Sequence, residues 1–184
     1  MLPLVADQPE CWPTLPLDSW KDTYATLHMW TQIVGKVRLN LTPVLNHWWN
    51  VPLYVTARGL STSRIPYGER SFELWFDFIR HQLVLETTDG VLKTLSLAPR
   101  SVADFYQEFM SMLRSAGIEV KIWRMPVEIP DPIAFDQGSD TRVVRSQISA
   151  DTLAHFVVGR FRLQPIQVGI HRQEQSGAFL LGKL

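Results

Sequence analysis

Residues 72–78 read Phe-Glu-Leu-Trp-Phe-Asp-Phe. Phenylalanine or leucine occupies every second position, and glutamate, tryptophan and aspartate occupy the positions between. Strict alternation over this length is typical of a β-strand that buries one face. The stretch therefore predicts the central strand of a sheet, and the flanking segments are interpreted outward from it.

The segments that follow predict the rest of an antiparallel meander. Two runs rich in β-forming residues, 83–87 and 91–97, flank Asp89-Gly90, a dipeptide typical of tight hairpin turns. Further along, residues 118–122 alternate isoleucine and valine with glutamate and lysine, which predicts one more strand.

The segment before the central strand predicts one strand and a loop. Residues 54–58 are rich in β-forming side chains and predict a strand that ends at Gly59. Residues 61–70 contain Pro66 and Gly68 and predict a loop. Three arginines surround this loop: Arg58, Arg64 and Arg70. These arginines could clamp a carboxylate or phosphate, form a solvated rim, or pair with acidic residues across the sheet.

Two helices are predicted, one on each side of the meander. In the first, Asp18 caps a run whose apolar residues recur at helical spacing as far as Leu41, and a proline two residues later ends it. In the second, Ser101 caps the run 102–116, and Gly117 suits the position after the last turn. This order predicts an α+β fold with two helices packed on one face of a mainly antiparallel sheet.

Four segments divide the chain. Residues 1–16 carry four prolines and predict an irregular arm, and residues 17–125 are expected to form the α+β domain. Prolines lock residues 126–137 into an extended linker. In residues 138–184 the apolar spacing fits neither a helix nor a strand, so we expect a poorly ordered tail there.

The composition restricts the class of protein. The 184-residue chain has 18 basic and 18 acidic residues, so no net charge would attract it to nucleic acid or to an anionic membrane. Its single cysteine, Cys11, excludes an internal disulfide framework and suits a reducing compartment. The first residues lack the pattern of a signal peptide, and no apolar run approaches the ~20 residues that span a bilayer. We therefore expect a soluble, cytoplasmic protein without nucleic-acid or membrane partners.

Several motifs of known chemistry are absent from the sequence. It contains no HExxH motif, no Cys/His metal spacing, no glycine-rich phosphate loop and no GxSxG elbow. These absences leave no support for a metal, a nucleotide or a covalent intermediate, so we expect no cofactor.

Three stretches carry a resemblance to a known family. They are LHMWTQIVGK at 27–36, NHWWNVPLYVTARGL at 46–60 and MPVEIPDP at 125–132. Together they resemble an uncharacterised bacterial family of unknown function over almost all of residues 15–137. The resemblance implies no activity and no catalytic residue. It implies that this chain is similar to the N-terminal half of a longer protein.

The tail lacks the motifs that the resemblance implies there. Members of that family continue with stretches similar to DRTHASYD and, later, GKxSPVHFFWGSFDLA. A shifted codon can be assembled from the last two bases of one residue's codon and the first base of the next. Such codons can encode the first of these stretches over residues 138–147 and the start of the second over residues 164–184. We therefore expect a change of reading frame near Gln137, as a real lesion or a sequencing error, and little or no function for this chain. The second motif also echoes residues 35–49, which suggests a duplicated unit.

The first candidate for a ligand pocket is the segment His47-Trp48-Trp49, between the first helix and the first strand. Two aromatic rings and an imidazole could line such a pocket, with Tyr54 and Arg58 beside them. The alternative is a buried aromatic anchor whose histidine bonds the backbone.

Three residues of the first helix are further candidates. Lys36 and Arg38 follow Gly35 near the helix end, where they could complement the helix dipole or meet an anionic ligand. His28 could also bind a ligand, and the alternative is a partly buried helix histidine.

These residues favour a small-molecule-binding domain whose ligand the sequence does not identify. A second hypothesis is a cofactor-independent enzyme in which His47 acts as acid or base and Lys36 or Arg58 stabilises an anion. A third is a structural or interaction module with an exposed aromatic face.

Overall fold

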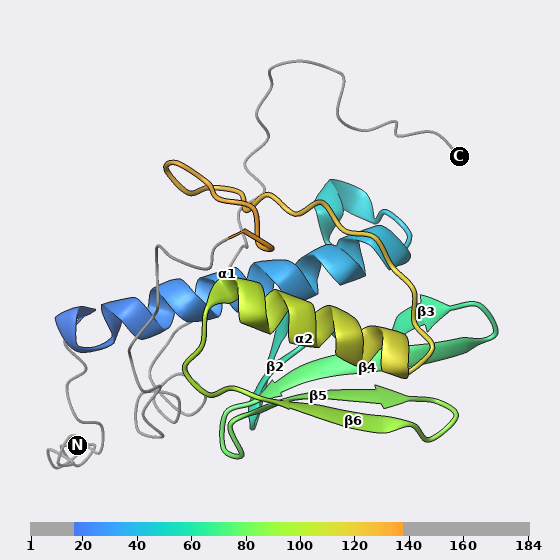
Figure 1. The fold of residues 1–184 in the computed structure, drawn as a ribbon. Coiled ribbons are helices and arrows are strands. Elements are labelled where there is room, and N and C mark those ends of the chain that lie inside the picture. The colour runs from blue at the N-terminus through green and yellow to red at the C-terminus, as the bar shows by residue number, and fades with distance from the viewer. Residues whose placement is uncertain (1–16, 138–184) are drawn as a thin grey trace, which may run out of the picture.

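The computed structural model describes residues 17–137. In this part of the chain six strands form one antiparallel sheet, and two long helices lie on the same side of it (Figure 1). The predicted α+β class, with two helices on one face of an antiparallel sheet, is confirmed.

The helices begin and end close to the predicted positions. α1 (Leu17–Leu41) is a 25-residue helix that continues through Gly35 without a break. α2 (Val102–Ser115) is capped as predicted, because the Ser101 hydroxyl accepts the backbone N–H of Asp104 at 3.0 Å. Gly117 follows the last turn with φ 69°, a left-handed conformation that glycine adopts without steric cost.

The sheet is a meander with one additional strand. Its strands are β1 (Tyr54–Thr56), β2 (Gly59–Ser61), β3 (Ile65–Tyr67), β4 (Arg70–Asp77), β5 (Gln82–Thr87) and β6 (Leu92–Ser96). The order across it is β1-β2-β4-β5-β6, with β4 at the centre. β2 pairs with the second half of β4 and β3 with the first half. The predicted hairpin of β5 and β6 is confirmed.

The loop predicted at residues 61–70 contains the strand β3. Pro66 lies within this strand, although proline has no backbone N–H to donate to a neighbouring strand. It is tolerated because β3 pairs with β4 alone, so its other edge carries no ladder in the described part of the chain.

The strand predicted at residues 118–122 is not formed, and that prediction is wrong. The alternation is real, since Ile118 is buried and Glu119 is exposed. However, the backbone N–H of Glu119 donates to the Tyr67 hydroxyl at 2.9 Å, and residues 118–122 pair with no strand in the part of the chain that the structure describes. Alternate burial requires only an extended chain over an apolar surface, whereas a strand also requires a free sheet edge.

The core lies between the helices and one face of the sheet. The Trp30 ring of α1 stacks on Phe105 of α2 with centroids 4.6 Å apart, and both side chains are fully buried. The alternating apolar residues of 72–78 are all buried, as predicted. Large aromatic side chains remove the most apolar area from water, so these contacts fix the helices on the sheet.

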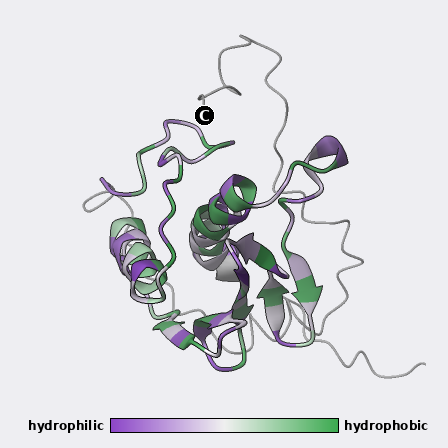
Figure 2. Cartoon of the chain, turned by 90° about the vertical axis from the view of Figure 1, so that its right-hand side faces the viewer, coloured by the Kyte–Doolittle hydropathy of each residue, from purple (hydrophilic) through white to green (hydrophobic). Residues whose placement is uncertain are grey.

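Residues 118–137, which we call the crossing segment, pass over the helices on the side away from the sheet (Figures 1 and 2). The Gln32 side chain of α1 holds this segment at both backbone groups of Val127, each at 2.9 Å. Phe135 is fully buried and stacks on Tyr106 of α2, with centroids 6.2 Å apart. The extended residues 126–137, expected as a linker, thus lie against both helices.

Candidate functional site

The sequence-predicted site residues fall into separate groups. Lys36 and Arg38 are two positions apart on α1, which turns their side chains about 200° from each other. Lys36 and His28 face the crossing segment, whereas Arg38 faces the chain around Tyr54. Arg58 lies in the turn between β1 and β2 and pairs with Asp77 of β4. The structure therefore brings Tyr54 together with Arg38, and it does not join Arg58, Lys36 or His28 to them.

A turn with an unusual backbone follows α1. Its centre is the 3-10 turn η1 (Asn46–Trp48), in which His47 has φ 52° and Trp48 has φ 61°. Left-handed backbone costs residues with a side chain about 1–2 kcal/mol each, and here two bulky residues adopt it in succession. Strain of this kind persists only where the surroundings hold it in place.

Hydrogen bonds from α1 hold this turn. The Asn50 side chain, almost fully buried, donates to the Thr42 hydroxyl at 2.9 Å and accepts the backbone N–H of Leu45 at 3.3 Å. Thr42 in turn donates to the backbone carbonyl of Arg38 at 2.7 Å. The turn is thereby fastened to the last turn of the helix.

The aromatic segment does not anchor the core. Trp49 is 69% exposed, His47 is exposed and Trp48 is half-buried. The alternative of a buried aromatic anchor is therefore wrong. Exposed apolar residues gather along this part of the chain: Val44, Leu45, Trp49, Tyr54 and Val55.

Arg38 is the most deeply buried charged group near this turn. It is 6% exposed, and its guanidinium donates to the backbone carbonyl of Pro52 and to the Ser63 hydroxyl, the second at 3.2 Å. The guanidinium carbon lies 5.0 Å from the centre of the Tyr54 ring. Arg38 thus connects the end of α1 to Pro52, which precedes β1, and to Ser63, which follows β2.

The guanidinium lacks a counter-charge. The described part of the chain offers no carboxylate in ion-pair contact with it, and its buried Nε–H has no hydrogen-bond acceptor. A guanidinium has five donors, and burial without acceptors or an opposite charge is unfavourable. The C-terminal end of α1 offsets part of the charge through the helix dipole.

A chain of serines links Arg38 to one carboxylate. The Ser63 backbone N–H donates to the Ser61 hydroxyl at 2.6 Å, and that hydroxyl donates to Glu73 at 2.5 Å. Ser63 also has a left-handed backbone, with φ 53°. Glu73 therefore orients the serines but makes no direct contact with the guanidinium.

The Arg58 guanidinium forms an ion pair with Asp77. Its Nε and Nη2 donate to one carboxylate oxygen of Asp77 at 2.9 and 2.7 Å. The other oxygen accepts the backbone N–H groups of Ile79 and Arg80 at 3.1 and 3.0 Å. Burial raises the pKa of Asp77, but these donors outweigh it and the net pKa lies below the usual value. Pairing of an arginine with an acidic residue across the sheet is thus confirmed.

Arg70 and Arg64 also have internal partners. Arg70 donates to the backbone carbonyls of Ala116 and Gly117 at 2.9 and 2.8 Å, which satisfies the end of α2. Arg64 donates to the Ser71 hydroxyl at 2.9 Å.

The opposite face of α1 carries Lys36 and His28. The Lys36 Nζ lies 4.6 Å from the centre of the Trp123 ring and 6.0 Å from that of Phe135, and burial lowers the pKa of this amine to about 8. The His28 Nε2 lies 3.1 Å from the Gln32 side-chain nitrogen. Burial lowers the pKa of His28, and the charge of Glu128 opposes that shift.

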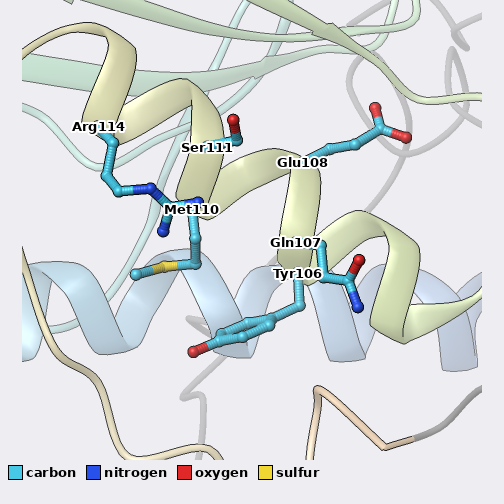
Figure 3. A pocket seen from close by; sticks show the side chains of 6 residues that line it. All are labelled: Tyr106, Gln107, Glu108, Met110, Ser111 and Arg114. Atoms are coloured by element: carbon cyan, nitrogen blue, oxygen red, sulfur yellow. The ribbon is translucent and has the colours of Figure 1, made fainter.

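A shallow hollow lies on α2 (Figure 3). Its volume is about 470 Å³, and six residues of the helix line it: Tyr106, Gln107, Glu108, Met110, Ser111 and Arg114. Most of these side chains are exposed polar groups on one open surface. The hollow contains no sequence-predicted site residue.

The described residues, 17–137, contain neither a cluster of metal ligands nor a membrane-spanning helix. No group of three or more histidine, cysteine, aspartate or glutamate side chains in this range could hold a metal ion. Neither helix of this range is long and apolar enough to cross a membrane.

Comparisons with known proteins identify a relationship but no activity. The model of a family of unknown function, DUF5996, matches residues 12–163, which includes every element described above and continues past Gln137. No curated protein and no solved structure matches the chain.

Proposed function

The chain belongs to the DUF5996 family, whose function is unknown, and we propose that it is a small-molecule-binding domain with its site at the C-terminal end of α1. The ligand in this proposal is a small anion that carries a carboxylate or a phosphate. Arg38 binds the anionic group, Tyr54 packs beside it, and the turn His47–Trp49 forms the rim.

One observation carries the proposal: the Arg38 guanidinium is buried without a counter-charge. Its Nε–H has no acceptor, and the carbonyl of Pro52 and the hydroxyl of Ser63 are neutral partners. Carboxylates and phosphates satisfy a guanidinium through two parallel hydrogen bonds. An anion bound there would supply both the missing charge and the missing acceptor.

The surroundings support access from the solvent. Tyr54 is 49% exposed although its ring lies over the guanidinium, and the exposed His47 and Trp49 belong to the chain just before Pro52. The Nε–H itself is buried, so the ligand requires the Tyr54 ring or this turn to move. Backbone strain clusters at ligand clamps, and loops often close over a bound ligand.

A panel of small anions tests the proposal. Acetate, oxalate, citrate, inorganic phosphate and phenyl phosphate are added at constant ionic strength set with chloride, and the melting temperature is measured. A ligand at 100 times its Kd adds about 2.7 kcal/mol to the free energy of unfolding. We expect at least one anion to stabilise the native chain and not Arg38→Met. An identical response in both proteins contradicts the proposal.

An interaction module is a second candidate, favoured by the exposed apolar side chains around Trp49. Contiguous exposed apolar surface often marks a contact with another chain. In this proposal the partner is a second copy of this chain, and light scattering at rising protein concentration measures the mass. We expect Trp49→Ser to lower the dimer fraction; a monomeric mass at all concentrations overturns this candidate.

The expected change of reading frame near Gln137 remains a proposal as well, and it concerns residues 138–184, outside the described residues. The family match continues to residue 163, past the expected position of the change. The gene sequence is therefore needed to decide whether the reading frame changes near Gln137. Resequencing the gene tests it: an alternative frame that encodes a stretch similar to GKxSPVHFFWG supports the proposal, and its absence overturns it.

A further inference from the structure

Gln32 fastens the crossing segment to α1, and a histidine lies beside this attachment. Gln32 is 2% exposed, and its amide meets both backbone groups of Val127: Nε2 donates to the carbonyl at 2.9 Å, and Oε1 accepts the N–H at 2.9 Å. These two bonds fix which way round the amide lies, because the opposite orientation would set oxygen against oxygen and N–H against N–H. The Gln32 nitrogen therefore also faces His28, one turn earlier on α1.

The orientation of this amide determines the protonation state of His28. The imidazole Nε2 lies 3.1 Å from the Gln32 nitrogen, which can only donate. Nε2 must therefore accept, which requires a neutral imidazole with its proton on Nδ1. An imidazolium carries a proton on both nitrogens, so its Nε2–H would point at an N–H group. Turning the Gln32 amide over would remove this conflict, but it would break both bonds to Val127.

Among the described residues, the titratable side chains beside this imidazole are Tyr24 and Glu128. The Tyr24 ring of α1 stacks on the imidazole with centroids 6.1 Å apart, and the charge of Glu128 acts on it from the crossing segment. Burial lowers the pKa of His28, and Glu128 opposes that shift without cancelling it. The attached crossing segment therefore disfavours the imidazolium in spite of the nearby carboxylate.

The backbone that follows Val127 favours release once its bonds to Gln32 are lost. Glu128 has φ 59° and Asp131 has φ 51°, left-handed conformations that are unfavourable for residues with a side chain. Strain of this kind persists only where the surroundings hold the chain in place. The two bonds from Gln32 act on the residue next to Glu128, so their loss removes a contact that holds the strained backbone.

We propose that Gln32 and His28 form a pH-sensitive latch, in which a proton taken from solvent at the His28 Nε2 releases the crossing segment from α1. After release the imidazole regains its ordinary pKa of about 6.5, above that of the attached state. The released state thus binds more protons, so attachment is complete above about pH 7 and weakens as the pH falls below about 6.5. The latch lies on the opposite face of α1 from the anion site and does not depend on it.

The tautomer of His28 is the first test. The chemical shifts of the two ring nitrogens, measured by nuclear magnetic resonance in the full chain at pH 7.5, distinguish a protonated nitrogen from an unprotonated one. We expect a neutral ring with the proton on Nδ1. A neutral ring with the proton on Nε2 overturns the inference, and this measurement requires no variant.

Hydrogen exchange measures the attachment itself. The protection factor of the Val127 amide, which compares the observed rate with the intrinsic rate at the same pH, should fall by about threefold or more between pH 7.5 and pH 5.0. An ordinary imidazole limits the fall to about thirtyfold over this range. The amide of Leu85, buried in β5 between two strands, is the reference for global unfolding. A smaller fall at Val127, or an equal fall at Leu85, overturns the inference.

Two histidine variants separate the latch from other effects of pH. His28→Gln offers the Gln32 nitrogen an oxygen acceptor that does not titrate, so the pH dependence at Val127 should disappear. The matched control, His81→Asn, removes a histidine between β4 and β5, where asparagine tolerates the left-handed φ of 53°. It should keep the full pH dependence. A fall that persists in His28→Gln, or one that is lost in His81→Asn, contradicts the assignment to His28.

Discussion

The guanidinium of Arg38 lies over the ring of Tyr54, 5.0 Å from its centre, and this contact takes the place that a carboxylate would have beside a buried arginine. A cation over an aromatic ring gains about 0.5–2 kcal/mol. It leaves the Nε–H of the guanidinium without an acceptor, whereas a carboxylate could have used it. The ring therefore holds the charge in place, and in the proposed function the Nε–H is the donor that remains for a ligand.

Arg38→Met distinguishes a binding role from a structural one. The variant removes the donors to Pro52 and Ser63, which lowers the free energy of unfolding. It also removes a buried charge that has no counter-charge, which raises the free energy of unfolding. We expect the free energy of unfolding in urea to change by less than about 2 kcal/mol. Arg38→Lys is the control that keeps the charge but not the fork of donors. A loss above about 4 kcal/mol in Arg38→Met identifies the arginine as a structural group.

Asp77→Asn should alter the acid stability of the protein. The folded pKa of Asp77 lies below its unfolded value, so its contribution is complete above about pH 4 and is lost as the pH falls through the folded pKa. We expect the variant to lose about 1.5–3 kcal/mol at pH 7, and this difference should shrink below pH 4. Urea denaturation from pH 2 to 7 measures it. Glu69→Gln changes an exposed carboxylate as a control; a difference that persists at pH 2 contradicts the account.

Two glycine substitutions should have opposite effects. Gly59 has φ 155°, and a Cβ there would lie 1.8 Å from the backbone oxygen of Phe76, so Gly59→Ala must shift β2 from β4. We expect a loss above about 3 kcal/mol or failure to fold. Gly35 has no atom within 4 Å of such a Cβ in the middle of α1, so Gly35→Ala should add about 0.5–1 kcal/mol. Urea denaturation of both variants checks this; equal losses contradict it.

Gln32→Leu should release the crossing segment from α1. It removes both hydrogen bonds to the backbone of Val127 in a buried location, at a cost of about 1–3 kcal/mol. Hydrogen exchange is the appropriate measurement, and we expect the amide of Val127 and its neighbours to exchange faster. Gln107→Leu, on the exposed surface of α2, is the control. Unchanged exchange at Val127 would show that other contacts hold the segment.

Most of the fold could be predicted because its signals are local. Alternation along 72–78, the Asp89-Gly90 turn and the Ser101 cap each depend on neighbours in the sequence, and the structure has each of them. The strand expected at 118–122 was wrong because alternation reports burial, while a strand also requires a partner edge. Only the three-dimensional arrangement decides whether such an edge exists.

The candidate site could be predicted only in part. Tyr54 and the segment 47–49 were identified by residue type, and Arg38 by its place near the helix end. Helical spacing already separates Lys36 from Arg38, but the sequence could not show that the crossing segment covers the Lys36 side of α1, because that segment is distant along the chain. It also gave no sign that Ser63 would meet Arg38, since that contact joins a helix to a strained loop.

The most direct test of the anion site is to observe the side-chain N–H resonance of Arg38 by nuclear magnetic resonance while inorganic phosphate or a small carboxylate is added. Constant ionic strength is maintained with chloride, and Arg100 and Arg58 serve as internal references. The proposal predicts a saturable shift of the Arg38 Nε–H, because that group has no acceptor before the anion binds. An Arg38 resonance that does not move while the anions bind elsewhere, or saturable binding that persists in Arg38→Met, would contradict it.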